Sequence, residues 1–114
     1  MRKCRNLITK DLKSVEKKYR ANMDRIEKLK LQIRDVEKQH RGLMRHTNPL
    51  APVTINTAGY ESILQEKAEN IRGMKGRKRV DIKQESVRIQ VAFINHLEQE
   101  LDQKIQSYEE SLSV

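Results

Sequence analysis

The chain has 114 residues, of which 36% are hydrophobic and 35% are charged, and its formal net charge is +8 at pH 7. It contains one Phe, three Tyr and no Trp, and only two Pro and four Gly interrupt it. This composition excludes a large globular core and a substantial β-sheet, and it predicts a single all-α domain built from long helices.

The first predicted element is a helix over about 9–42, with Thr9 as its N-cap and Gly42 near its end. Its apolar residues follow the seven-residue repeat that is typical of a coiled-coil seam. The seam residues predicted to drive self-association are Leu12, Val15, Tyr19, Ile26, Leu29, Ile33 and Val36. Because a helix cannot bury so narrow a stripe alone, it must pack against another helix of the chain or against a second copy.

Two polar residues, Asn22 and His40, interrupt this seam. Asn22 is either a partly exposed side chain or a buried one that sets the register of the helices. His40 is interpreted as a partly exposed residue near the helix end.

A loop over 43–58 follows, because Pro49 and Pro52 cannot continue a helix. It carries the apolar residues Leu50, Val53 and Ile55. Two interpretations are open: the loop is a connector that covers the end of the helical bundle, or it is a docking loop for a partner.

The rest of the chain, about 59–112, is predicted to be helical, with Ser62 in a capping box at its start. Gly73 and Gly76 mark a bend or a break at 73–79, and Asp81 offers a new N-cap beyond it. A bend gives one long helix that returns antiparallel to the first, which is a coiled-coil-like hairpin. A break gives three helices, of which the last runs parallel to the first.

Charge favours the long antiparallel hairpin, because residues 1–46 carry 15 Lys and Arg against 6 Asp and Glu, whereas residues 81–114 carry 3 against 7. We therefore expect such a hairpin, paired with a second copy into a dimeric helical bundle. The three-helix arrangement broken at 73–79 is the alternative.

The densest basic cluster consists of Lys75, Arg77, Lys78 and Arg79. These residues are candidate contacts to a protein partner or to nucleic acid, and a solvated surface is the alternative interpretation. Single-strand binding normally uses aromatic residues interleaved with the basic ones, and this cluster has none. The spacing of the segment also does not fit a helix-turn-helix.

Catalysis has little support in this sequence. His40, His46 and His96 lack metal-binding spacing, Cys4 has no matching ligand, and no phosphate-binding glycine loop is present, so we expect no cofactor, no metal and no small-molecule substrate. The single cysteine excludes an intrachain disulfide, and neither a secretory signal nor a membrane span is recognisable. These observations predict a cytoplasmic protein without a membrane partner, or a nuclear one in a eukaryote.

The function predicted from these patterns is non-enzymatic. We expect a self-associating helical protein that acts as an adaptor, scaffold or regulator through protein–protein interaction, with an unidentified protein as its partner. The alternative is a basic, dimeric regulatory protein that binds nucleic acid through residues 72–79 and the exposed Lys and Arg of the first helix.

Overall fold

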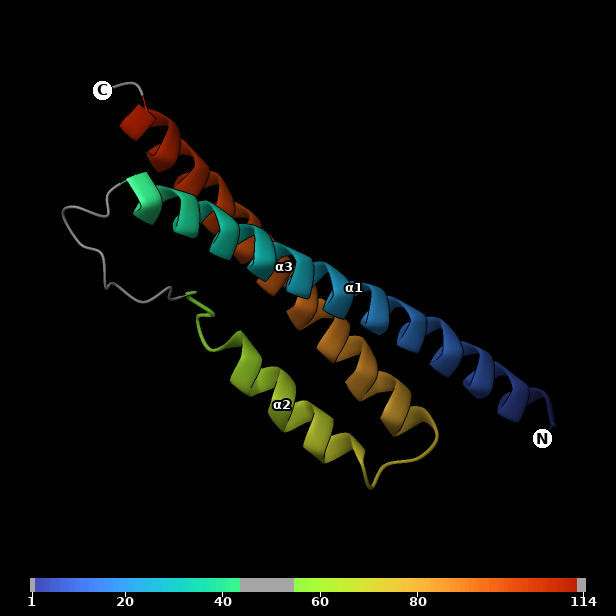
Figure 1. The fold of residues 1–114 in the computed structure, drawn as a ribbon. Helices are drawn as coiled ribbons and strands as arrows, with labels where there is room; N and C mark the ends of the chain where they lie inside the picture. Colours follow the sequence, from blue (N-terminus) through green and yellow to red (C-terminus); the bar gives the residue numbers. More distant parts are fainter. Residues whose placement is uncertain (1, 44–54, 113–114) are drawn as a thin grey trace.

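The computed structural model describes residues 2–43 and 55–112, with the side chains of α1 described from residue 7 to residue 42, and it contains three helices (Figure 1). α1 spans Arg2–Leu43, α2 spans Tyr60–Ile71 and α3 spans Arg77–Leu112. The described part of the chain forms a rod of 68 × 22 × 15 Å without any β-strand, which confirms the all-α class. No described helix is long and apolar enough to cross a membrane.

The two long helices, α1 and α3, pack side by side and run in the same direction. Their paired residues advance together along both helices, with sequence separations between 66 and 73. The pairs are Asp11–Arg77, Tyr19–Gln90, Arg25–Glu98 and His40–Ser111. α2 runs in the opposite direction, so the helical hairpin of this fold lies between α2 and α3 (Figure 1).

Of the two predicted arrangements, the chain therefore takes the three-helix one. The break at 73–79 is a true turn, because Gly76 adopts a left-handed conformation with φ of 67° that reverses the chain. The long single helix over 59–112 and its antiparallel return are not formed. The exposed ion pairs that favour the antiparallel return contribute only about 0–1 kcal/mol each, so they do not override the turn at Gly76.

Two predicted helix starts differ from the structure. α1 begins at Arg2 instead of at Thr9, since the residues before Thr9 include neither Pro nor Gly and continue the helix readily. α2 begins at Tyr60, in agreement with the predicted start at about 59, but its N-cap is Gly59, which makes no side-chain hydrogen bond, and not Ser62. α3 begins before Asp81, which lies inside the helix and forms an ion pair with Arg77 at 3.4 Å.

The core lies in the middle of the rod, where α1 and α2 both pack on α3. Its buried residues are Ile26, Leu29, Ile33, Leu64, Phe93 and Leu97. Tyr60 of α2 stacks on Phe93 with ring centroids 5.3 Å apart. Among the described residues, α1 and α2 make no close backbone approach to each other, so α3 is the central helix.

The predicted seam faces this core. Four of its residues are buried (Val15, Ile26, Leu29 and Ile33), and three are half-buried (Leu12, Tyr19 and Val36). Asn22 is half-buried, and His40 is half-buried and hydrogen-bonded to Ser111. The seam is filled by α3 of the same chain, and self-association through it stays a prediction.

Candidate nucleic-acid interface

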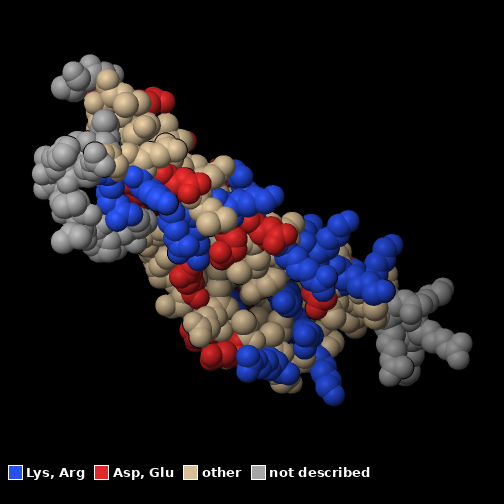
Figure 2. Space-filling view, viewed as in Figure 1, with Lys and Arg blue, Asp and Glu red and all other residues tan. Residues whose placement is uncertain are grey.

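One end of the rod is strongly basic. We call this the basic end and define it as residues 7–20 of α1 together with residues 67–88, which run from the last turn of α2 into α3. It holds 13 Lys and Arg against 5 Asp and Glu, whereas the other described segments, 21–43, 55–66 and 89–112, hold 7 against 11. Figure 2 shows this concentration of Lys and Arg over the N-terminal half of α1 and the α2–α3 turn. The basic end arises because α1 and α3 run parallel, which brings the N-terminal half of α1 and the start of α3 to the same end of the rod.

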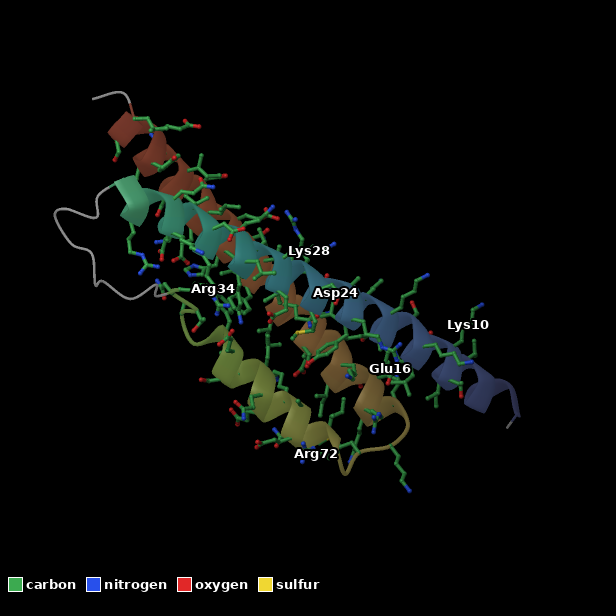
Figure 3. The ribbon with its side chains drawn as sticks, viewed as in Figure 1. Lys10, Glu16, Asp24, Lys28, Arg34 and Arg72 are labelled. Carbon is green, nitrogen blue, oxygen red and sulfur yellow. The ribbon has the colours of Figure 1, made fainter. Side chains whose placement is uncertain are left out.

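The outward side of α1 supplies a row of cations at the basic end. Lys10, Lys13, Lys17 and Arg20 follow the spacing of one helical face, opposite the buried Val15, and all four are exposed. Figure 3 shows Lys10 projecting away from the other two helices. None of the four forms an ion pair with a side chain that the structure describes. This row therefore remains available to an external anion.

Acidic residues of the basic end are already occupied by internal partners. Asp11 accepts a hydrogen bond from Arg77 at 2.9 Å, and Glu85 accepts one from Lys67 at 2.9 Å. The hydrogen bond from Lys67 and its charge lower the pKa of Glu85, which keeps this carboxylate ionised. Asp11 and Glu85 thus join helices to each other and form no ion pair with the outer row of cations.

Lys83 is one of the partly buried cations of this region. Its Nζ lies 3.9 Å from the centroid of the Tyr19 ring, which is cation–π geometry. Burial lowers the pKa of Lys83, Glu16 opposes the shift, and the positive charges of Arg79 and Arg20 add to it. Arg79 and Arg20 therefore lie near enough to Lys83 for their positive charges to disfavour its protonated form.

The structure divides the predicted basic cluster into two pairs. Arg77 is bound to Asp11 and Asp81, and Arg79 donates to the Met74 carbonyl at 3.4 Å, so both arginines stabilise the turn. Lys75 and Lys78 are exposed and form no ion pair within the described part of the chain. Exposed Arg72 lies beside them at the turn (Figure 3).

Sequence reasoning pointed to the exposed Lys and Arg of the first helix in general but did not single out Lys10, Lys13 and Lys17. The signal was present, because the three lysines recur at the spacing of one helical face. What the sequence left open was the direction of α3, which decides whether this row and the turn lie at the same end.

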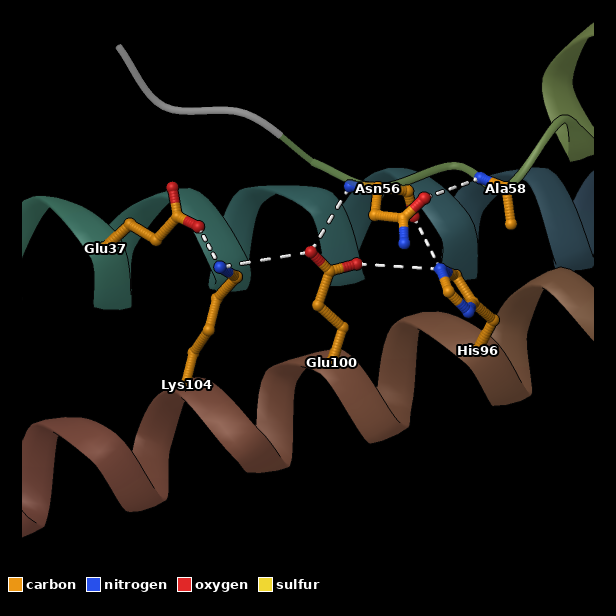
Figure 4. Close-up of polar contacts among 6 residues, drawn as sticks. All are labelled: Glu37, Asn56, Ala58, His96, Glu100 and Lys104. Atoms are coloured by element: carbon orange, nitrogen blue, oxygen red, sulfur yellow. Dashed lines mark hydrogen bonds and ion pairs between the residues drawn. The ribbon is translucent and has the colours of Figure 1, made fainter. Parts of the chain in front are cut away.

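The predicted docking loop is described only at its C-terminal end. Leu50 and Val53 lie outside the described residues, whereas Ile55 is half-buried against the core, as the connector interpretation requires. Asn56 is held on α3 at two points (Figure 4). Its backbone N–H donates to Glu100 at 3.3 Å, and its carbonyl accepts from His96 Nε2 at 2.6 Å.

A second layer of charges supports this attachment. Lys104 forms ion pairs with Glu37 of α1 and with Glu100, so the loop end, α1 and α3 are linked (Figure 4). The Asn56 side chain also accepts a hydrogen bond from the Ala58 N–H at 3.0 Å, which supports the positive φ of Ala58 before α2. His96, Glu100 and Lys104 thus have a structural role, which is to attach the loop end to α3 and α1.

Among the described residues, no group of three or more His, Cys, Asp or Glu side chains could hold a metal ion. Comparisons with protein-family models, with curated proteins and with solved structures give no match. The case for a function therefore depends on the geometry of this chain alone.

Proposed function

We propose that this chain is a non-enzymatic helical protein that binds the phosphate backbone of duplex nucleic acid through its basic end. The observation that carries this proposal is the parallel packing of α1 and α3, which puts the lysine row of α1 beside the α2–α3 turn. A concentrated surface of Lys and Arg is the electrostatic signature of a protein that neutralises phosphates. Of the two predicted functions, the nucleic-acid alternative gains most from this geometry.

Duplex backbone fits this surface better than single strands do. Single-strand binding commonly uses aromatic side chains on which bases stack. The only aromatic residue of the basic end is Tyr19, whose ring is covered by Lys83. Exposed lysines on a rigid helix can bind phosphates without reading bases, so we expect binding that is independent of sequence.

The interaction-protein hypothesis, an adaptor, scaffold or regulator that self-associates, is favoured by a separate observation. None of the described helices covers an apolar strip of α3, on which a second copy of the chain could pack. The two hypotheses use different faces of the rod and are compatible.

A salt titration with duplex DNA tests the proposed binding. Fluorescence anisotropy should show affinity that falls steeply with salt. The variant K10Q/K13Q/K17Q should lower the slope of log K against log[salt] by about 2.7, which is 0.9 for each phosphate that a lysine no longer neutralises. The control, K28Q/R34Q/K38Q, removes three exposed cations from the same helix outside the basic end. It should leave most of the slope in place.

Two outcomes would refute the proposal. One is the absence of binding at low salt by the intact chain. The other is an equal decrease of affinity in both triple variants, which would mean that net charge alone, and not the basic end, determines binding. Circular dichroism of each variant checks that helicity is unchanged.

A further inference from the structure

The side of the α1–α3 pair that faces away from α2 carries an apolar strip that none of the described helices covers. Helical spacing puts Val87, Val91 and Ile105 on one side of α3, while Phe93 and His96 on another side contact Tyr60, the first residue of α2. Val91 is 47% exposed, and Val87 and Ile105 are half-buried. We call the strip and its flanking residues the α2-free face.

A groove between α1 and α3 opens on this face. It is lined by Asp11, Ser14, Val15, Lys18, Gln84, Val87 and Arg88, and no residue of α2 contributes to it. Its floor is apolar, through Val15 and Val87, and its rim is cationic, through Lys18 and Arg88. Apolar residues that recur along a helix without an internal partner are typical of an interface between helices.

Charge along the α2-free face changes sign from one end to the other. Lys18 and Arg88 flank the strip toward the basic end, and Asp102 flanks it farther along α3, where Glu98 is already paired with Arg25 of α1 at 3.3 Å. Arg88 and Asp102 are 14 residues apart, which corresponds to about 21 Å along the helix axis. When a second copy runs in the opposite direction, the positive part of its face therefore lies next to the negative part of the first copy's face.

We propose that two copies of this chain pair in antiparallel directions through their α2-free faces. A two-fold axis level with residues 95 and 96 puts Val87 opposite Ile105 of the second copy. It puts Val91 opposite Leu101, which is half-buried because its side chain also packs against the core. It also brings Arg88 within one helical turn of Asp102 of the second copy. A parallel pairing would instead put each charged group next to its own like-charged equivalent.

This dimer covers Lys18 and Arg88 of the basic end but leaves its lysine row and its turn exposed. Lys10, Lys13 and Lys17 lie on the outward side of α1, and the α2–α3 turn lies at the end of the rod. The two proposals can therefore fail separately, since the substitutions that test them are different.

Sedimentation equilibrium of the full chain tests the pairing. The intact chain of 13.4 kDa should sediment as a dimer at micromolar concentration. Val91→Glu should give a monomer with unchanged helicity, because it puts two unpaired carboxylates into the interface. Ile63→Glu is the matched control, since Ile63 is 44% exposed on α2, and it should remain dimeric.

Charge reversal tests the direction of the two copies. Arg88→Glu alone and Asp102→Arg alone should each weaken the dimer about tenfold, and the double variant R88E/D102R should restore it. A parallel dimer would show no such restoration. A monomeric intact chain, an oligomer larger than a dimer, a V91E variant that stays dimeric, or a double variant without recovery would each overturn the proposal.

Discussion

Replacing the buried Gln90 with leucine should stabilise the protein. Gln90 lies on α3 between the two long helices and is fully buried, with 0% of its surface exposed. Its Nε2 donates to the Tyr19 carbonyl at 3.2 Å, but its Oε1 has no hydrogen-bond partner among the described residues. The side chain therefore keeps one polar atom away from water without compensation.

The size of the effect follows from three contributions. An unpaired buried acceptor costs about 1–3 kcal/mol, and the hydrogen bond to Tyr19 contributes about 1 kcal/mol. The Tyr19 carbonyl also accepts the helical hydrogen bond of α1, so the substitution does not leave it unpaired. Because leucine adds apolar burial in a similar volume, we expect a net gain of about 2 kcal/mol in the free energy of unfolding.

Urea denaturation at one protein concentration, followed by circular dichroism, measures this change. Gln90→Leu should raise the midpoint, and the melting temperature should rise by roughly 5–10 °C. Gln106→Leu, at an exposed position of the same helix, is the control and should change the free energy of unfolding by less than about 0.5 kcal/mol. A decrease of stability in Gln90→Leu would refute the reasoning, because it would mean that the amide is satisfied in solution.

Two further predictions concern the turn and the acid-sensitive ion pair. Gly76→Ala should destabilise the chain by about 1–2 kcal/mol, because alanine disfavours a φ of 67°. Gly73→Ala should not, because φ is not positive at Gly73 and nothing lies within 4 Å of the added carbon. Equal effects of the two substitutions in urea denaturation would contradict the role given to Gly76 in the turn. The pKa of Glu85 is lowered from its ordinary value of 4.5, so its hydrogen bond with Lys67 stabilises the folded chain above about pH 4.5. This contribution is lost as the pH falls through the lower pKa of the folded state. The urea midpoints of the intact chain and of Glu85→Gln should therefore differ at neutral pH and converge on acidification, and a difference that is constant with pH would rule out this pair as its source.

The sequence predicts the helices well because helical spacing and burial are local properties. Val15, Ile26, Leu29 and Ile33 belong to the predicted seam, and all four are buried. The direction of α3 could not be predicted in the same way. Its apolar stripe fits α1 in either direction, and the choice depends on whether the chain bends or turns at Gly76.

The candidate site shows the same division. The cluster at Lys75 and Lys78 is visible in the sequence as a run of basic residues, and both side chains are exposed in the structure. The role of Arg77 could not be predicted, because its partner Asp11 is 66 residues away in the chain. Which cations are available to a ligand depends on such long-range pairs, and a sequence pattern does not contain them.

The parallel arrangement of α1 and α3 also has a consequence for the order of folding. The ion pair between α2 and α3 joins residues 18 apart, whereas the polar pairs between α1 and α3 join residues 66 to 73 apart. Closing the longer loop costs more chain entropy, so we expect the α2–α3 hairpin to form early and α1 to dock afterwards. This protein should accordingly fold more slowly than an up-and-down helical bundle of equal length, and substitutions between α1 and α3 that break late interactions should act mainly on its unfolding rate.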